Sequence, residues 1–250
     1  MKIENYVLGA ALALFAGCHT VVPQTSNLIA DKGEAKEHAA NTIPAYRLAA
    51  DRGFGFRAEI GLTKSGKILT YAQDVDQRAR LEDVLELVRG NRRTILEIKG
   101  GAAIVPVLKA ALSDNASATP DRLYIASPNP DVCKALRDVM SEYPVLWRTE
   151  SENPDEILGV LADTGAAGVD LKFGENGEKL IAAVRQAGYA VNAWNVSDYE
   201  TAVCALSAGA DTVSVDGAQA IFDTYREQRR GSGGFGESYS APRDPAALMF

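Results

Sequence analysis

Residues 27–62, NLIADKGEAKEHAANTIPAYRLAADRGFGFRAEIGL, contain one complete strand–helix–strand unit. The short apolar segment 27–31 predicts a strand that ends in charged residues. Residues 42–53 follow a helical apolar pattern and stop at a glycine, as helices commonly do. Residues 56–62 predict the next strand, so this stretch favours two parallel strands joined by a crossover helix.

The same alternation continues along the chain. Further strands are predicted at residues 94–99, 122–127, 144–149, 167–172, 189–195 and 211–216. Further helical patterns lie at residues 81–90, 102–113, 131–142, 154–165, 176–188, 198–209 and 218–228. Eight strands alternating with helices predict an α/β fold with a single (β/α)8, or TIM, barrel. An open doubly wound sheet is the alternative, because strands that are apolar on both faces fit either architecture.

The predicted barrel occupies residues 27–230, with one additional hairpin strand at 67–72 after a turn at Ser65–Gly66. Residues 19–26 predict a short tether, and the Gly-, Ser- and Pro-rich segment 231–250 predicts a flexible tail. The chain has 250 residues, 46% of them hydrophobic, which is enough to bury one sizeable core.

Residues 6–18, YVLGAALALFAGC, form an apolar run that is too short for a comfortable transmembrane helix. Small residues precede Cys18, so residues 1–18 predict a bacterial lipoprotein signal in which Cys18 becomes lipidated. An ordinary cleaved signal and an uncleaved anchor are the alternatives, and all three export the chain. The sequence therefore predicts a location in the bacterial cell envelope, periplasmic or surface-facing, with a lipid anchor in the membrane.

The net charge of −7 comes without any basic cluster interleaved with aromatic residues, which argues against a nucleic-acid partner. Cys133 and Cys204 lie within amphipathic helical patterns and are expected to be small buried residues. A disulfide between them is possible in an oxidising compartment, and the sequence does not decide whether it forms. The sequence shows no Cys/His metal spacing, phosphate-binding P-loop, dinucleotide-binding glycine motif or Ser/His/Asp order.

Charged and polar residues gather at the predicted strand ends, where the active sites of TIM barrels lie. These ends supply Asp31, Lys32, Glu59, Glu97, Lys99, Ser127, Arg148, Glu150, Asp170, Lys172, Trp194, Asn195 and Asp216. Glu59 and Glu97 are predicted to share a divalent cation such as Ca²⁺ or Mg²⁺, which prefers oxygen ligands. Lys32, Lys99 and Lys172 are predicted to neutralise an anion such as phosphate. The alternative is an internal salt-bridge network that holds the upper layer of the barrel together.

Histidines are scarce, and none lies at a predicted strand end. His38 follows Asp31 by seven residues, so it is either solvated or close enough to reach the barrel mouth. General acid–base chemistry would therefore depend on carboxylates or lysines, and Asp31 is the first candidate for a catalytic residue.

Six segments, in the right order along the chain, resemble the glycerophosphodiester phosphodiesterases, a family of (β/α)8 barrels. They are residues 41–54, 53–67, 81–88, 96–99, 125–137 and 191–198. Residues 53–67, GFGFRAEIGLTKSGK, are similar to the family's Glu-x-Asp metal pair followed by Thr-Lys-Asp-Gly, and LEIK at 96–99 is similar to its Glu-x-Lys strand. The resemblance implies acid–base catalysis by two histidines, phosphate binding by an arginine and a lysine, and a metal held by carboxylates.

The catalytic positions of that family are replaced in this chain. The family's His-Arg-Gly at the end of strand one corresponds to Asp31, Lys32 and Gly33, and the His-Asp after the hairpin corresponds to Ala72 and Gln73. Alanine neither accepts nor donates a proton. A lysine keeps the charge of arginine but lacks its bidentate fork.

The metal-binding positions are kept only in part. The glutamate of a family Glu-Asn-Thr motif corresponds to Ala40, and the aspartate of Glu-x-Asp corresponds to Gly61, whereas Glu59, Glu97 and Lys99 are retained. Losing an anionic ligand weakens a divalent-cation site, so Ca²⁺ or Mg²⁺ is expected to bind weakly. The family's insertion after the hairpin, which helps to wall the substrate pocket, is nearly absent.

The sequence therefore predicts an exported, catalytically degenerate member of the family. It would bind a phosphorylated or otherwise anionic ligand, or a protein partner, at the barrel mouth with Lys32, Lys99 and Trp194. A working hydrolase with a site rebuilt from Asp31, Glu59, Glu97 and His38 is the alternative. A third and weaker hypothesis is glycoside cleavage by two carboxylates.

Overall fold

The computed structural model describes residues 23–90 and 92–231. The predicted signal segment 1–18 with Cys18, the first part of the predicted tether and residues 232–250 of the predicted tail lie outside this range. Among the described helices, none combines the length and apolar character needed to cross a membrane.

Eight parallel strands close into a barrel. They are β1 (Leu28–Ala30), β2 (Gly55–Leu62), β4 (Thr94–Ile98), β5 (Leu123–Ser127), β6 (Val145–Thr149), β7 (Gly168–Lys172), β8 (Ala190–Val196) and β9 (Thr212–Val215). From β4 to β9 each strand pairs with the next, β2 pairs with β4, and β1 pairs with both β2 and β9. The predicted TIM barrel is thus confirmed, and the open doubly wound sheet is wrong.

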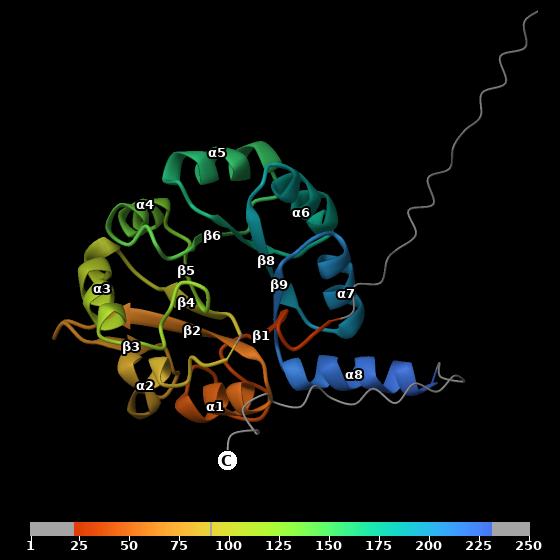
Figure 1. Ribbon diagram of the computed structural model, residues 1–250, viewed down its shortest axis with the longest axis horizontal. Coiled ribbons are helices and arrows are strands. Elements are labelled where there is room, and N and C mark those ends of the chain that lie inside the picture. Colours follow the sequence, from red (N-terminus) through yellow and green to blue (C-terminus); the bar gives the residue numbers. More distant parts are fainter. Residues whose placement is uncertain (1–22, 91, 232–250) are drawn as a thin grey trace, which may run out of the picture.

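Helices surround the strands as an outer ring, as Figure 1 shows. They are α1 (Ile43–Asp51), α2 (Leu81–Leu85), α3 (Val105–Ser113), α4 (Pro130–Val139), α5 (Pro154–Thr164), α6 (Gly177–Gln186), α7 (Tyr199–Ser207) and α8 (Ala218–Gly231). Local signals explain several of their starts, because Asn129, Asn153 and Asp198 each accept a hydrogen bond from a free backbone N–H of the first turn. Proline in the first turn of α1, α3, α4 and α5 favours the same positions.

Two elements are shorter than the sequence predicted. Helix α2 stops at Leu85 instead of continuing to residue 90, because Leu87 and Val88 bond back three residues rather than four and tighten the turn. The hairpin strand β3 (Ile68–Thr70) pairs antiparallel with the end of β2. Two single-turn 3₁₀ helices complete the fold, η1 (Val75–Gln77) after the hairpin and η2 (Ala102–Ile104) before α3.

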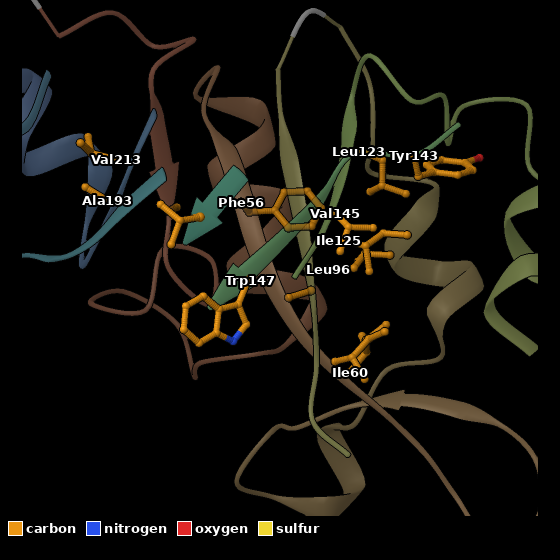
Figure 2. Packing of buried hydrophobic residues seen from close by; sticks show 14 of the residues in the cluster. Phe56, Ile60, Leu96, Leu123, Ile125, Tyr143, Val145, Trp147, Ala193 and Val213 are labelled. Carbon is orange, nitrogen blue, oxygen red and sulfur yellow. The ribbon is translucent and has the colours of Figure 1, made fainter. Parts of the chain in front are cut away.

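The hydrophobic core has two parts, because alternate residues of a strand point to opposite faces. The larger cluster lies between the barrel and its helices, and its members labelled in Figure 2 are Phe56, Ile60, Leu96, Leu123, Ile125, Tyr143, Val145, Trp147, Ala193 and Val213. A separate cluster of Ile29, Ile95, Ala126 and Leu146 belongs to the opposite strand faces, which line the barrel interior. Only part of that interior is therefore apolar.

Neither of the two cysteines in the described chain takes part in a disulfide. Cys133 is buried in α4, as predicted, whereas Cys204 in α7 is exposed, so the expectation that both are buried is wrong for Cys204. The disulfide that the sequence left open is absent from the structure.

A substitution at Gly168 would test how closely strands β7 and β8 pack against each other. It pairs with Ala190 across β7 and β8, and a Cβ atom added at Gly168 would lie 2.2 Å from the carbonyl oxygen of Ala190. Because backbone cannot yield cheaply there, we expect Gly168→Ala to lower the free energy of unfolding by about 1–3 kcal/mol. Urea-induced unfolding followed by circular dichroism measures the change.

The matched control is Gly159→Ala, in the exposed part of helix α5, where an added Cβ meets nothing within 4 Å. This substitution should raise the free energy of unfolding by about 0.5–1 kcal/mol, because alanine is the better helix former. Equal effects of the two substitutions would contradict the close β7–β8 contact.

Candidate functional site

The charged residues of the barrel interior lie above its small apolar cluster. Strand alternation places Arg57 and Glu59 of β2 on the same face, and the strand register pairs Arg57 with Ile95 and Glu59 with Glu97. The interior thus changes from apolar side chains to ionised ones toward the C-terminal ends of the strands, where TIM-barrel sites lie. We call this end the barrel mouth.

Arg57 occupies the centre of the charged layer. Its side chain is completely buried, and its guanidinium donates to both carboxylate oxygens of Asp170, at 2.6 and 2.9 Å. It also donates to Glu97 at 3.0 Å and to the hydroxyl of Ser214 at 2.9 Å. Burial alone would lower the pKa of Arg57, but Asp170, Asp31 and Glu97 outweigh it, so this arginine stays charged.

Asp31, the predicted catalytic residue, follows β1 directly and contacts the same guanidinium. Its Oδ1 lies 3.1 Å from Nε of Arg57, but the geometry is not that of a hydrogen bond, and each buried atom lacks one. Burial raises the pKa of Asp31, although Arg57 and Lys32 oppose this rise. Asp31 is therefore the mouth carboxyl that takes up a proton more readily than an ordinary aspartate.

Asp170 has the opposite behaviour. Burial alone would raise its pKa, but the positive charges of Arg57 and Arg148 outweigh this effect. Hydrogen bonds from Arg57 and Asn192 lower the pKa of Asp170 further. Arg148 donates to Asp170 at 2.7 Å and Asn192 donates at 2.6 Å. The pKa of Asp170 is consequently lowered, and this fully buried carboxylate stays ionised.

Glu59 and Glu97, the predicted metal ligands, do lie together in the upper layer. The ammonium of Lys99 sits 3.4 Å from Glu59 and 3.1 Å from Glu97. Burial lowers the pKa of Lys99, but the two glutamates outweigh that effect and raise it. Among the residues described, no three His, Cys, Asp or Glu side chains are grouped to hold a metal ion.

Asn41 fixes the position of Glu59. This buried residue has a left-handed backbone, with φ of 61°, and its amide donates to the Glu59 carboxylate at 2.7 Å. The amide oxygen accepts from the Glu59 backbone N–H at 3.1 Å and from the Tyr46 hydroxyl at 2.9 Å. In the sequence, Asn41 stood out only as the first residue of the segment 41–54 that resembles the family.

Trp194 forms one wall of the mouth. The guanidinium of Arg148 lies 3.8 Å from the centre of its ring, and the ammonium of Lys172 lies 5.7 Å from it. The indole N–H donates to the backbone carbonyl of Asp170 at 3.2 Å, which fixes the ring against β7. Lys172 is also paired with Glu150 at 2.7 Å.

Lys32, the other predicted ligand-binding residue, lies in a tight turn after Asp31. Lys32 has φ of 60° and Gly33 has φ of 83°, and a side chain at Gly33 would collide with the backbone of Ala45. Glu34 connects this turn to helix α8. Its carboxylate accepts a hydrogen bond from the backbone N–H of Gln219, at the start of α8, at 3.1 Å. Within residues 23–90 and 92–231, Lys32 makes no ion pair, which leaves its charge available.

Two other positions that the sequence singled out, Ala72 and His38, take part in none of the ion pairs described above. Ala72, at the place of a family catalytic histidine, is buried and offers only its backbone carbonyl, which accepts from Arg78 at 3.3 Å. His38 is exposed and lines a cavity of about 450 Å³ together with Asp76, Arg78 and Asp83. This cavity lies between the loop that follows β1 and the segment that follows β3.

Sequence reasoning missed Arg57, Asn41 and Asn192. A signal for two of them was present, because Arg57 lies two residues before Glu59 and Asn192 two residues before Trp194, on the same strand faces. Asn41 carried no such signal, since its contacts depend on a left-handed backbone.

Comparisons with known proteins identify the family and the fold. The family model described as the glycerophosphoryl diester phosphodiesterase family matches residues 69–220. No curated protein sequence matches the chain.

Solved structures share the fold at low sequence identity. A glycerophosphodiester phosphodiesterase from Parabacteroides distasonis is 18% identical, with a TM-score of 0.69 over 81% of this chain and 97% of that chain. A phosphodiesterase from Oleispira antarctica, in complex with its product sn-glycerol-3-phosphate, is 16% identical, with a TM-score of 0.68 over 84% and 99%. A glycerophosphodiester phosphodiesterase from Thermotoga maritima is 16% identical, with a TM-score of 0.65 over 83% and 100%.

Removing Arg57 tests whether the interior network depends on it. We expect Arg57→Met to lower the free energy of unfolding by about 3–5 kcal/mol at pH 7, because buried carboxylates lose their counter-charge. Arg57 opposes the rise in the pKa of Asp31 and lowers the pKa of Asp170, so both pKa values should rise in the variant. The folded variant then binds protons that the unfolded chain does not, and its deficit should shrink as pH falls from 7 toward 5.

The control is Arg89→Met, which removes the partner of Asp51 in a half-exposed surface pair. Such pairs contribute about 0–1 kcal/mol, and no pH dependence is expected in the same range. Denaturant unfolding at several pH values measures both variants, and equal losses would contradict a central role for Arg57.

Proposed function

The chain belongs to the glycerophosphoryl diester phosphodiesterase family, and from this premise we propose that it is a catalytically degenerate member that binds an anionic, phosphorylated small ligand at the barrel mouth. The family match covers more than half of the chain and bears out the resemblance recognised in its sequence. The observation that carries the proposal is Ala72, a buried methyl group at the position of a catalytic histidine. A site without that proton carrier lacks one half of the family's acid–base pair.

Cations at the mouth support an anionic ligand. Lys32 makes no ion pair within the described chain, although its charge acts on the neighbouring Asp31, and the side chain of Lys99 is 38% exposed. Arg148 presents its guanidinium against Trp194 while holding Asp170. Charge-assisted hydrogen bonds from such groups are the usual means of binding phosphate. A protein partner with a phosphorylated or acidic segment is the second candidate ligand, and it would use the same cations.

An active hydrolase with a rebuilt site is the alternative function. The raised pKa of Asp31 favours it, because burial makes this carboxyl take up a proton more readily than an ordinary aspartate, as a general acid must. His38, proposed as a further member of that site, lines the cavity with Asp76 and Asp83. Glycoside cleavage is weaker, because Glu97 and Asp170 are both bound by Arg57 and Arg148.

Export and lipid anchoring through Cys18 are part of the proposal and rest on the sequence of residues 1–18. An anchored barrel would place its mouth in the bacterial cell envelope. Metabolic labelling with a fatty acid, compared between the wild type and Cys18→Ser, tests this part. Labelling that persists in Cys18→Ser would contradict it.

Binding of sn-glycerol 3-phosphate tests the proposed function directly. We expect the wild-type chain to bind this probe in the presence of EDTA, and Lys32→Met to weaken binding about tenfold or more, since a hydrogen bond to a charged group contributes about 1.5–3 kcal/mol. Lys32 suits the test because it has no structural ion pair to lose. Isothermal titration calorimetry measures the dissociation constants.

Lys134→Met, on the exposed face of α4, is the matched control and should bind like the wild type. Equal binding by the two variants would contradict a site at the mouth. Steady hydrolysis of a glycerophosphodiester by the wild type that is abolished by Glu97→Ala would establish the alternative function.

A further inference from the structure

The chain's family implies a divalent cation held by carboxylates at the barrel mouth, but the donors present do not fit one. We propose that the mouth is a metal-independent site, in which the ammonium of Lys99 takes the position between Glu59 and Glu97 that the cation would need. The inference deepens the proposed function and rests on it only for the location of ligand binding. Its evidence concerns the two glutamates, Lys99 and their neighbours.

Lys99 is bonded where a shared metal would have to sit. Its ammonium lies 3.1 Å from Oε1 of Glu97 and 3.4 Å from Oε1 of Glu59, so one group bridges both predicted ligands. Ca²⁺ and Mg²⁺ require oxygen ligands at about 2.0–2.6 Å. A cation between these carboxylates would therefore have to displace Lys99.

Position 61, where the resemblance places a further family carboxylate, lies against the ring of Tyr71. A Cβ atom added at Gly61 would lie 2.4 Å from Cε2 of Tyr71 and 2.8 Å from its hydroxyl oxygen. The Tyr71 hydroxyl donates to the backbone carbonyl of Lys99 at 3.1 Å, which fixes the ring in this place. No carboxylate can enter from position 61 unless Tyr71 moves away.

Glu97 has little capacity left for another cation. It is almost completely buried, and Arg57 donates to its Oε2 at 3.0 Å. Its Oε1 accepts from Lys99, and Nε of Arg148 lies 3.4 Å away. A metal would have to replace bonds to charged partners, and stripping water from a divalent cation adds to that cost.

The charges within the network also give a dication little attraction. Four carboxylates, Asp31, Glu59, Glu97 and Asp170, lie among three cations, Arg57, Lys99 and Arg148. Only one negative charge is left uncompensated in this set, and Asn41 already donates to Glu59. A ligand anion would therefore depend on the N–H donors of the mouth and not on a metal, so EDTA should leave its affinity unchanged.

Metal titrations without any phosphate ligand test the proposal on the full chain. We expect millimolar Ca²⁺ or Mg²⁺ to leave the wild-type melting temperature unchanged and to give no heat of binding in calorimetry. In Lys99→Met the two glutamates lose their shared partner while Arg57 and Arg148 still hold Glu97, so Ca²⁺ should bind only weakly, at millimolar concentrations, and raise the melting temperature slightly. Lys99→Gln, a polar substitute, is the second variant in case Lys99→Met does not fold.

Lys172→Met is the matched control, because Lys172 lies at the same rim but pairs with the exposed Glu150. It should gain no Ca²⁺ binding. Submillimolar metal binding by the wild type that is lost in Glu97→Gln would overturn the proposal. So would folded Lys99 variants that gain no affinity for Ca²⁺. Failure of the wild type to bind sn-glycerol 3-phosphate both in EDTA and with added Ca²⁺ would count against the proposed function, whereas binding only with added Ca²⁺ would overturn this inference.

Discussion

The interior of the barrel depends on the buried guanidinium of Arg57. It bonds Glu97 of β4, Asp170 of β7 and Ser214 of β9 and contacts Asp31 after β1, so side chains from well-separated parts of the sequence share one charge. Buried ion pairs add little net stability compared with apolar packing, but removing one partner leaves an uncompensated charge. The members of this network are therefore constrained to change together.

The sequence was informative about the fold because helical and strand periodicities differ. Alternation of these patterns predicted the eight strands and the closed barrel, and side-chain caps such as those of Asn129 and Asn153 explain why helix starts were recognisable. Element ends were harder to predict. Helix α2 ended early because the backbone N–H groups of Leu87 and Val88 bond back three residues instead of four, which the apolar pattern of residues 81–90 does not reveal.

The sequence predicted that the candidate-site residues lie at the strand ends, but not how they bond to one another. Glu59, Glu97, Lys99 and Trp194 do meet at the mouth, and the interpretation of the strand-end charges as a salt-bridge network agrees with the ion pairs observed. Which charge pairs with which depends on the closure of the barrel, because partners such as Arg57 and Asp170 are 113 residues apart. A single sequence does not show which residues far apart in the chain lie close together in the fold. Arg57 was therefore interpreted as an ordinary strand residue.

The contact between Tyr71 and Gly61 couples two positions at the rim of the barrel. An aspartate at position 61 would require the half-exposed tyrosine ring to turn away. That movement would break the hydrogen bond from the Tyr71 hydroxyl to the backbone carbonyl of Lys99. A carboxylate at position 61 would therefore also loosen the backbone of the residue whose ammonium lies between Glu59 and Glu97.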